Sequence, residues 1–323
     1  MSRLTLYGLV FLLLSGFSFF LGFVAQVFLW LGGLIYLPYE TFLTALMNSA
    51  LFVSFASLAV FIIIILTDFA RSMFEPKTGN VRYDPIGKPK ISVVMTAWND
   101  EKSIYDAVMD FKNQDNVIEV VVVENNSKDD TAKLAGKAGA RVVTETTPGY
   151  GSVCMRALRE ASPEANIVVL VEGDMTFSGY DIKKLVPYLD NVGMVLGTRT
   201  TQELLNQKTQ LGWFTIWGNL FLAKLIQLKY WNFKTWGRVR LTDVGCTLRA
   251  IRRESLDKIV NKLKVDSDHF SPHMIIVALD NKLKVIEIPV TFKERVGISK
   301  GAGSNNWKAF KVGLKMLRTI FFS

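Results

Sequence analysis

The sequence predicts an α/β protein with a mixed, mostly parallel sheet flanked by helices, preceded by two membrane-spanning helices. Three observations lead to this prediction. Short apolar runs alternate with helical segments between residues 91 and 198. Two uncharged stretches precede them, each longer than the roughly 20 residues that a helix needs to cross a bilayer. A basic, Trp-rich segment over residues 204–240 predicts amphipathic helices at a membrane surface.

Residues 1–72 are predicted to form a transmembrane helical hairpin. Residues 4–39 carry no charge, Glu40 interrupts, and residues 41–67 are again uncharged. The first apolar block is longer than that of a cleaved signal peptide and a second follows it, which favours two spans. Five basic residues follow the second span: Arg71, Lys77, Arg82, Lys88 and Lys90. Together with Arg3 before the first span, they place both ends of the hairpin, and hence the rest of the chain, in the cytoplasm.

Residues 73–90 are predicted to be a linker, because three Pro and two Gly interrupt them. Beyond them, strands and helices alternate at the spacing of a largely parallel sheet with helices on both faces. The strands are predicted at residues 91–95, 117–123, 141–145, 167–171 and 193–198. The helices between them are predicted at residues 101–114, 129–139, 151–161 and 180–190.

Polar residues follow four of these strands. They lie at residues 96–101, 124–131, 172–174 and 197–199. Because open α/β sheets bind ligands at the carboxyl ends of their strands, we expect these groups to form one site. Glu172 and Asp174 are its most distinctive members, two carboxylates directly after a continuous apolar run. An isolated Glu-x-Asp pair is more often solvated, so the functional interpretation depends on this setting.

Charge and cysteine content narrow the class of protein. The formal net charge is +9, and Arg3 and Glu40 are the only charged residues before Asp68, so the excess belongs to the part after the hairpin. A basic domain tethered to a membrane most simply faces anionic lipid or a phosphorylated ligand. No nucleic-acid recognition motif is recognisable, so no nucleic-acid partner is expected. Cys154 and Cys246 fit neither a metal-site spacing nor a disulfide framework.

Six stretches of the chain carry a family resemblance in the correct order. They are ISVVMTAWNDEKSI, VVVVENNSKDDTAKLA, PGYGSVCMRALREA, LVEGDM, TDVGCTLRAIRRES and VIEIPVTFKERVGISK. They resemble the family-2 glycosyltransferases of the A-type nucleotide-sugar transferase fold, and the last two resemble the polyprenyl-phosphate sugar synthases, such as the dolichol-phosphate mannose and glucose synthases. The resemblance covers residues 91–300 and implies a glycosyltransferase catalytic domain there.

The resemblance also implies a role for individual residues. Contacts to a UDP- or GDP-linked sugar donor are implied for Ala97, Asn99, Glu101, Glu124, Asn126, Gly151, Glu172 and Gly173. A Mg²⁺ or Mn²⁺ ion on the donor diphosphate is expected to bind Asp174, with Glu172 and Thr176 beside it. The phosphate of a polyprenyl or dolichyl phosphate acceptor is expected at Arg199, Thr215, Asn219, Arg295, Ser299 and Lys300. The catalytic role itself is expected of Asp174, Arg199, Arg295 and Lys300.

The sequence departs from the family pattern at several of these places. Glu172 stands where Asp is usual, and Thr176 where relatives often carry Gln. Tyr150 stands where Lys is common, and Glu124 and Asn125 replace an acid pair. Leu211 takes the place of an Arg in the segment 204–240, which leaves Lys208 as its substitute. These departures affect contacts around the diphosphate and the acceptor but leave Asp174 unchanged.

The chemistry of the acceptor separates the remaining hypotheses. A hydroxyl acceptor needs a general base, for which Asp243 is the best candidate in the second half of the chain. A phosphate monoester is already largely ionised near neutral pH, so it needs cations instead. We therefore expect metal-dependent, inverting transfer of one sugar to polyprenyl or dolichyl monophosphate at the cytoplasmic membrane face, with inversion implied by the resemblance. Transfer to a lipid-linked or free sugar hydroxyl, and a catalytically weak scaffold, are the alternatives.

Two later segments are expected at the membrane surface. Residues 204–242 contain no acidic side chain and hold four of the seven Trp. Residues 301–323 are predicted to form an amphipathic basic helix. Its apolar stripe consists of Trp307, Phe310, Leu314, Leu317 and Phe321, and its basic flank of Lys308, Lys311, Lys315 and Arg318. This helix either lies along anionic lipid or packs on the catalytic domain with its basic side in water.

Overall fold

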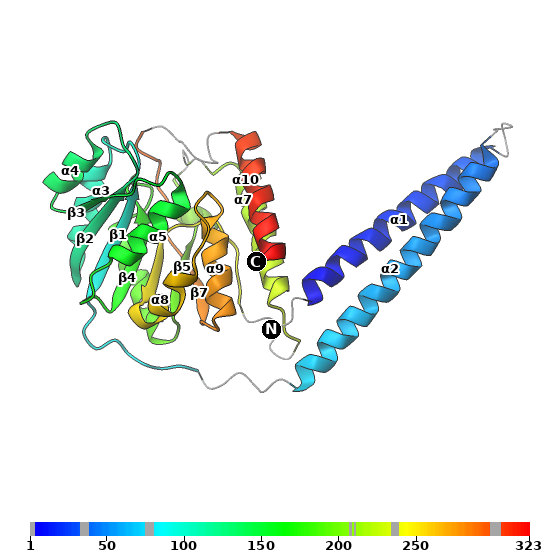
Figure 1. The fold of residues 1–323 in the computed structure, drawn as a ribbon, viewed down its shortest axis with the longest axis horizontal. Coiled ribbons are helices and arrows are strands. Elements are labelled where there is room, and N and C mark those ends of the chain that lie inside the picture. The colour runs from blue at the N-terminus through cyan, green and yellow to red at the C-terminus, as the bar shows by residue number, and fades with distance from the viewer. Residues whose placement is uncertain are drawn as a thin grey trace. The chain divides into compact units, whose positions relative to one another are not determined.

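The computed structural model describes residues 4–32, 39–74, 81–206, 209, 211–233, 239–297 and 305–323. The chain divides into two compact units. Unit 1 comprises residues 1–78 and 228–238, and unit 2 comprises residues 79–227 and 239–323. The hairpin predicted for residues 1–72 falls in unit 1, and the sheet in unit 2 (Figure 1).

Unit 1 contains the two predicted hairpin helices, α1 (Leu4–Gly32) and α2 (Glu40–Phe74). Both are long and apolar enough to cross a membrane, judged by length and composition. The helices meet through small side chains, with the Ser15 and Ser54 hydroxyl oxygens 3.3 Å apart. Small residues let helices approach closely in lipid, where apolar contact alone gives no preference for a partner. Helix α2 ends at Phe74, two residues beyond the predicted boundary.

The sheet of unit 2 has seven strands in the order β3-β2-β1-β4-β6-β5-β7. They are β1 (Ile91–Ala97), β2 (Val117–Glu124), β3 (Arg141–Thr144), β4 (Ile167–Glu172), β5 (Met194–Thr198), β6 (Arg249–Arg252) and β7 (Val285–Pro289). Strand β6 runs antiparallel to β4 and β5, and the other pairs are parallel. The predicted mixed, mostly parallel sheet is therefore confirmed. The five predicted strands match β1 to β5 within two residues at each end.

Eight α-helices of unit 2 are described. They are α3 (Ile104–Lys112), α4 (Thr131–Lys137), α5 (Tyr150–Glu160), α6 (Ile182–Leu185), α7 (Trp213–Lys229), α8 (Arg253–Ile259), α9 (Phe270–Asp280) and α10 (Asn306–Phe322). The helix predicted at residues 180–190 is divided, with 3₁₀ turns at Gly179–Asp181 and Val186–Asp190 around α6. Pro187 opens the second turn, where a proline cannot donate the hydrogen bond that an α-helix requires.

Both faces of the sheet are covered, which explains the continuous apolar runs. Side chains such as Val93, Val122 and Val169 join one core with residues of α3, α4 and α6. On the other face α5 packs against β1, β2 and β4. Helix α9 contacts α5, and α10 in turn packs on α9 (Figure 1). Because successive strand residues point to opposite faces, the last residues of β4 are divided between the two sides.

The polar strand ends meet at one edge of the sheet, as predicted. Ala97 at the end of β1 pairs with Glu124 at the end of β2. Thr96 on β1 pairs with Glu172 at the end of β4. The carboxyl ends of β1, β2 and β4 are therefore level, and the residues that follow them can act on one ligand.

Candidate active site

The turn after β4 depends on a glycine. The Gly173 amide donates to the Thr96 carbonyl oxygen at 2.9 Å, which continues the parallel pairing by one residue. A Cβ at Gly173 would lie 2.5 Å from Cδ1 of Ile104, so no other residue fits without a shift of the core. The small residue between the two acids therefore has a packing role. It lets the chain turn directly after Glu172 and bring Asp174 to the sheet edge.

Asp174 is 1% exposed and engaged on both oxygens. Its Oδ1 accepts hydrogen bonds from the Thr176 amide at 3.1 Å and the Thr176 hydroxyl at 2.6 Å. Its Oδ2 lies 3.2 Å from Nη1 of Arg295. Nη2 of Arg295 lies 3.4 Å from Oδ1 of Asp100, so the guanidinium bridges two carboxylates. The structure thus joins three of the predicted residues, Asp174, Thr176 and Arg295, in one cluster.

Arg199 is held by Asp243 through a two-pronged ion pair. The distances are 2.7 Å from Nε to Oδ2 and 2.9 Å from Nη2 to Oδ1. The guanidinium carbon also lies 5.1 Å from the ring centroid of Phe292. Burial opposes ionisation of Asp243, but the Arg199 charge and hydrogen bonds hold the pKa of this carboxyl below its ordinary value. Asp243 is therefore a carboxylate with both oxygens occupied, which makes it a poor general base.

Glu287 on β7 fixes the loop that carries Asp243. Its Oε2 accepts hydrogen bonds from the Thr242 amide at 2.6 Å and the Thr242 hydroxyl at 2.8 Å. Its Oε1 accepts the Asp243 amide at 3.0 Å. Burial raises the pKa of Glu287 to about 7, in spite of these hydrogen bonds. Ionisation of this carboxyl in the folded protein is therefore unfavourable.

Stability is expected to fall between pH 4.5 and pH 7 because of Glu287. Below pH 4.5 the Glu287 carboxyl is protonated in both the folded and the unfolded protein. Between pH 4.5 and pH 7, the unfolded chain loses the proton while the folded chain retains it, so rising pH favours unfolding. We expect a loss of about 3 kcal/mol, which the substitution Glu287→Gln should remove. Thermal unfolding without divalent ions at pH 5 and pH 8 checks this, and an equal pH dependence in both proteins would contradict it.

Helix α7 brings Asn219 beside Arg199. A Cβ at Gly245 would lie 3.0 Å from Nη2 of Arg199 and 3.0 Å from both side-chain end atoms of Asn219. The three residues therefore meet, although they come from β5, α7 and the loop before β6. Thr215 lies one helical turn before Asn219 on α7 and shares its side of the helix. Arg199 and Asn219, two of the residues predicted to bind the acceptor, are thus neighbours.

Glu172 interacts electrostatically with both Arg199 and Asp174. Burial raises the pKa of Glu172 to about 7, and the negative charge of Asp174 acts in the same direction. The positive charges of Arg295 and Arg199, and a hydrogen bond from the Tyr150 side chain, oppose the rise. Glu172 therefore lies within electrostatic reach of three of the four predicted catalytic residues. Lys300, the fourth, and Ser299 lie outside the described residues.

The ends of β1 and β2 are tied together on the predicted donor side. Asn99 accepts the Lys128 amide at 2.7 Å through Oδ1, and its own amide donates to the Ser127 hydroxyl at 3.1 Å. Glu124 is buried and accepts the Ser127 amide at 2.7 Å. Asn126 is exposed and reaches the Thr146 carbonyl oxygen at 3.0 Å. With Ala97, these residues form one continuous rim.

Two more of the predicted donor residues make close contacts within the protein. Glu101 is exposed and exchanges hydrogen bonds with the loop before α4, donating its amide to Asp129 at 3.2 Å and accepting the Asp130 amide at 3.4 Å. A Cβ at Gly151 would lie 2.1 Å from the Val265 carbonyl oxygen, so this glycine lets another loop approach α5. Neither contact points to a ligand.

The sequence reasoning included Asp100 in the polar group 96–101 but gave it no role of its own. Asp100 lies between the predicted residues Asn99 and Glu101, but its partner Arg295 is 195 positions away. No local spacing signals such a pair. Phe292 was missed, because its contact with Arg199 depends on the path of the chain after β7.

The residues present fit a divalent cation whose ligands come partly from the protein and partly from a bound substrate. The described residues contain no group of three or more His, Cys, Asp or Glu side chains that could hold a metal. Mg²⁺ needs only one or two carboxylates when substrate phosphates and water complete its shell. Asp174 and Glu172 can supply these. The Arg295 guanidinium lies beside Oδ2 of Asp174, so this oxygen can face a positive charge.

Comparison with known proteins gives consistent results. The sequence pattern described as Glycosyl transferase family 2 matches residues 92–260, which is 169 of the 323 residues. An uncharacterized protein of Methanocaldococcus jannaschii is 29% identical over 253 residues, covering 76% of this chain and 98% of that protein. A Haloferax volcanii protein named dolichyl-phosphate hexose transferase is 28% identical over 214 residues, covering 65% and 86% respectively.

A solved structure shares the fold. It is the Mycobacterium tuberculosis glucosyl-3-phosphoglycerate synthase in complex with Mn²⁺, uridine diphosphate and glucosyl-3-phosphoglycerate. The TM-score is 0.54 at 20% sequence identity, and the match covers 72% of this chain and 78% of that chain.

Proposed function

The chain belongs to glycosyl transferase family 2, and we propose that it transfers one sugar from a UDP- or GDP-linked donor to the phosphate of polyprenyl or dolichyl phosphate. The observation that carries this proposal is the character of the cluster around Glu172. Two guanidinium groups, Arg199 and Arg295, lie there, while Asp243, the acid expected from the sequence to act as a base, is occupied. Such a site favours an acceptor that needs cations over one that must lose a proton.

In the proposed reaction, an acceptor phosphate oxygen attacks the anomeric carbon on the side opposite the leaving group. The new carbon–oxygen bond forms as the bond to the nucleotide diphosphate breaks, and the electron pair leaves with the diphosphate. Arg199 and Arg295 orient the acceptor phosphate and reduce its repulsion from the donor. A bound Mg²⁺ or Mn²⁺, held by Asp174 with Glu172 and Thr176 beside it, would supply charge stabilisation for the leaving diphosphate.

The alternatives fit the site less well. Transfer to a hydroxyl needs a base with a free oxygen near the reacting carbon, and Asp243 has none that its partners leave open. A weak scaffold would not need buried, paired charges at the carboxyl ends of the strands, because burying ion pairs rarely stabilises a fold. The relative named dolichyl-phosphate hexose transferase also supports the phosphate acceptor.

Membranes that contain the protein test this function. They are incubated with a panel of labelled UDP- and GDP-sugars and added polyprenyl phosphate. We expect label in a lipid that mild acid cleaves, since a sugar phosphate ester at the anomeric carbon is acid-labile. Label only in an acid-stable glycoside would assign the protein to hydroxyl acceptors, and no transfer from any sugar would favour the scaffold.

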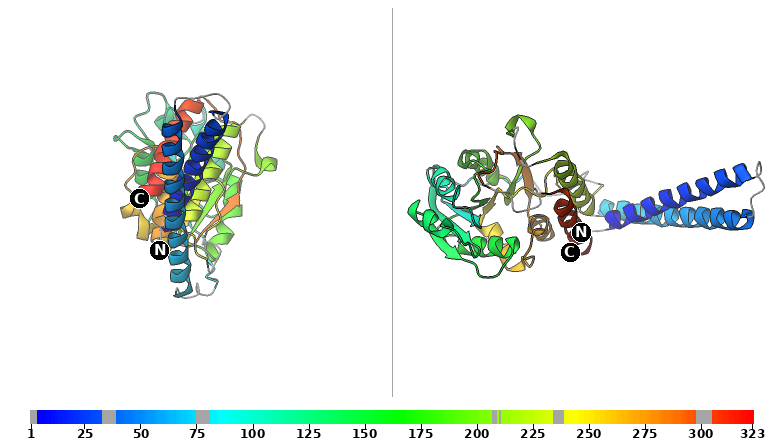
Figure 2. Two further views of the ribbon diagram at one scale, coloured as in Figure 1. Left: turned by 90° about the vertical axis from the view of Figure 1, so that its right-hand side faces the viewer. Right: turned by 90° about the horizontal axis from the view of Figure 1, so that it is seen from above.

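We further propose that α7 and α10 hold the catalytic unit against the cytoplasmic membrane surface. Helix α10 packs through Val312, Met316 and Ile320, which is a different face from the predicted apolar stripe. Of the stripe, Trp307, Phe310 and Leu314 are exposed, and Leu317 and Phe321 are half-buried. Helix α10 runs beside α7 in all views (Figures 1 and 2). We call the following residues the α7–α10 surface: Trp213, Trp217, Phe221, Trp307, Phe310 and Leu314. Each is between 43% and 72% exposed.

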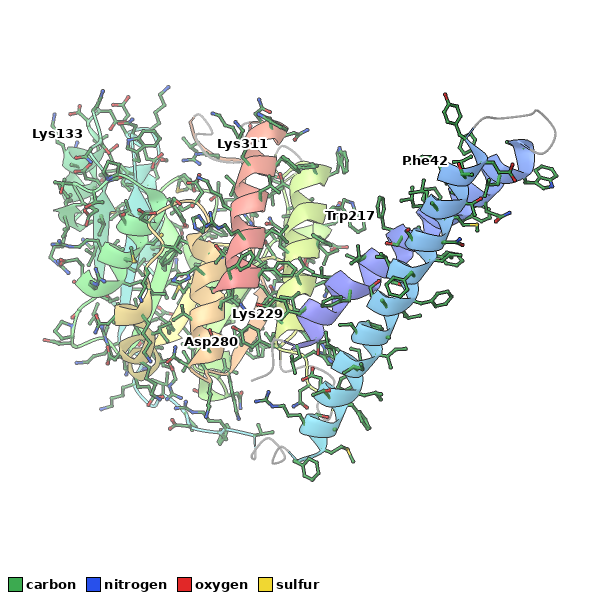
Figure 3. All side chains as sticks on the ribbon, turned by 45° about the vertical axis from the view of Figure 1, so that its right-hand side comes forward. Phe42, Lys133, Trp217, Lys229, Asp280 and Lys311 are labelled. Atoms are coloured by element: carbon green, nitrogen blue, oxygen red, sulfur yellow. The ribbon has the colours of Figure 1, made fainter. Side chains whose placement is uncertain are left out.

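The chemistry of the α7–α10 surface fits anionic lipid. Trp favours the headgroup level of a bilayer, and flanking Lys and Arg attract negative lipids. The basic residues Lys308, Lys311, Lys315 and Arg318 are all exposed. Figure 3 labels Trp217 on α7 and Lys311 on α10. For the predicted interface segment 204–240, the described residues contain one α-helix, α7 (Trp213–Lys229).

Changing Lys308, Lys311 and Lys315 together to Gln is expected to raise the Michaelis constant for polyprenyl phosphate in anionic vesicles about tenfold. Each cation near such a surface contributes about 1 kcal/mol, and salt screens part of this. The Michaelis constant for the nucleotide sugar should stay unchanged. A matched variant with Lys102, Lys133 and Lys137 changed to Gln should behave as wild type, since Lys133 lies on the opposite side of unit 2 (Figure 3). Equal effects on both substrates, or in both variants, would contradict the membrane role.

A further inference from the structure

We propose that Arg295 is an internal counter-cation that occupies the metal-binding oxygen of Asp174 and leaves it for the acceptor phosphate when the divalent ion binds. This inference rests on the proposed function, because it states how metal binding at Asp174 and phosphate binding by Arg295 depend on each other. In the metal-free protein one guanidinium neutralises two buried carboxylates, Asp174 and Asp100. The same guanidinium is one of the cations, with Arg199, that we propose for the acceptor phosphate among the described residues.

The contacts of Arg295 are those of a replaceable partner. Its Nη1 is 3.2 Å from Asp174 Oδ2 and its Nη2 is 3.4 Å from Asp100 Oδ1, both longer than the usual charged hydrogen bond. Its Nε is buried and has no hydrogen-bond partner among the described residues. An unsatisfied buried donor is unfavourable, so this pose leaves binding capacity unused. A phosphate oxygen is the kind of group that could use it.

The backbone keeps Arg295 near Asp174 even if the side chains separate. The Val296 amide donates to the Asp174 carbonyl oxygen at 3.3 Å, and the Lys293 amide donates to the Thr176 carbonyl oxygen at 2.7 Å. The segment 293–296 is therefore fixed along the acidic turn. The guanidinium can leave Asp174 by rotation of the Arg295 side chain alone. Because the backbone does not move, the guanidinium stays close to the acidic turn.

Two cations at Asp174 Oδ2 repel each other, so they compete for this oxygen. The other oxygen, Oδ1, already accepts two hydrogen bonds from Thr176. A divalent ion at Oδ2 therefore weakens the contact with Arg295, and the repulsion drives the guanidinium towards the nearest anion. Conversely, an anion that takes Arg295 away from Asp174 opens the carboxylate for the ion. By thermodynamic reciprocity, each ligand must strengthen the binding of the other by the same factor.

The first experiment measures Mn²⁺ binding to the full chain in detergent without any sugar donor, by electron paramagnetic resonance of the free ion. Arg295→Gln is expected to tighten Mn²⁺ binding about tenfold, since the competing charge is removed. Arg295→Lys keeps the charge and should stay near wild type. Lys293→Gln neutralises a nearby cation that does not bridge the carboxylates and should change affinity less than about twofold. Unchanged or weaker binding by Arg295→Gln, with a melting temperature close to wild type, would overturn the proposal.

The second experiment measures coupling with methyl phosphate, a soluble phosphate monoester. In wild type, methyl phosphate should tighten Mn²⁺ binding severalfold, and Mn²⁺ should tighten methyl phosphate equally. In Arg295→Gln this coupling should disappear, and in Lys293→Gln it should persist. Coupling that survives in Arg295→Gln would overturn the proposal while leaving the transfer reaction untouched. If wild type bound no Mn²⁺ even with uridine diphosphate present, the metal-dependent function itself would fail, which is a distinct result.

Discussion

Replacing Asp174 with Asn is expected to lower kcat/KM about 1000-fold while the protein remains folded. A neutral amide is a much poorer ligand for a hard cation than a carboxylate. The loss of one well-placed electrostatic partner in a buried site typically changes rates by factors of about 100 to 1000. The Asn side chain can still accept hydrogen bonds from Thr176, so the turn should keep its shape. Transfer of labelled sugar to polyprenyl phosphate, with a range of added Mg²⁺ and Mn²⁺, is the measurement.

Two variants place this result in context. Glu172→Gln should reduce activity less, because Glu172 is half-buried whereas Asp174 is fully buried, so the charge of Glu172 is better screened by water. Thr176→Val removes one hydrogen bond to Asp174 and should reduce activity about fivefold, in keeping with a net hydrogen-bond contribution near 1 kcal/mol. Full activity of Asp174→Asn, or of wild type in excess chelator, would rule out the metal-dependent mechanism.

Replacing Asp243 with Asn is expected to lower the free energy of unfolding by about 3 kcal/mol. The substitution leaves Arg199, whose side chain is 11% exposed, as a buried charge without its counter-ion. For a domain of this size, such a loss lowers Tm by roughly 6–12 °C. Activity should fall mainly through a higher Michaelis constant for polyprenyl phosphate, since Arg199 loses its fixed orientation. Thermal unfolding in detergent and two-substrate kinetics provide the measurements.

The double variant Asp243→Asn with Arg199→Gln separates the causes. Removing both charges should recover part of the lost stability, because no uncompensated charge remains. Acceptor binding should not recover, because the cation is gone. If Asp243→Asn instead keeps its melting temperature and loses about 10,000-fold in kcat alone, Asp243 is the general base and the acceptor is a hydroxyl.

The strands of the early sheet could be predicted because both of their faces are buried. Val121 and Val122 point to opposite cores, yet both must be apolar, so the run stands out in the sequence. The acids after β4 were recognisable for the same reason, since polar residues end such a run abruptly. Strand β6 could not be recognised this way. It is four residues long and begins and ends with Arg, whose buried charges only the folded surroundings explain.

Pairings that join distant parts of the chain were beyond prediction. The resemblance implied a role for Arg295 at the acceptor phosphate, whereas its contacts with Asp174 and Asp100 depend on the path of the chain after β7. Helix α10 shows a second limit. Val312 and Met316 are as apolar as Trp307 and Leu314, so spacing alone cannot tell which face packs and which stays exposed. The face of α10 that packs is decided by the position of α9.

The reversed direction of β6 determines how this enzyme can diversify. Because β6 is antiparallel, the loop that enters it arrives at the same edge where β1, β2 and β4 end. Residues 199–248, which include α7 and the Asp243 loop, are therefore inserted between two strands without altering any pairing among β1 to β4. This segment can be lengthened, shortened or exchanged as a cassette while the half of the sheet that carries Glu172 and Asp174 is inherited unchanged. Evolution can thus retain the strands that carry Glu172 and Asp174 while the inserted segment changes.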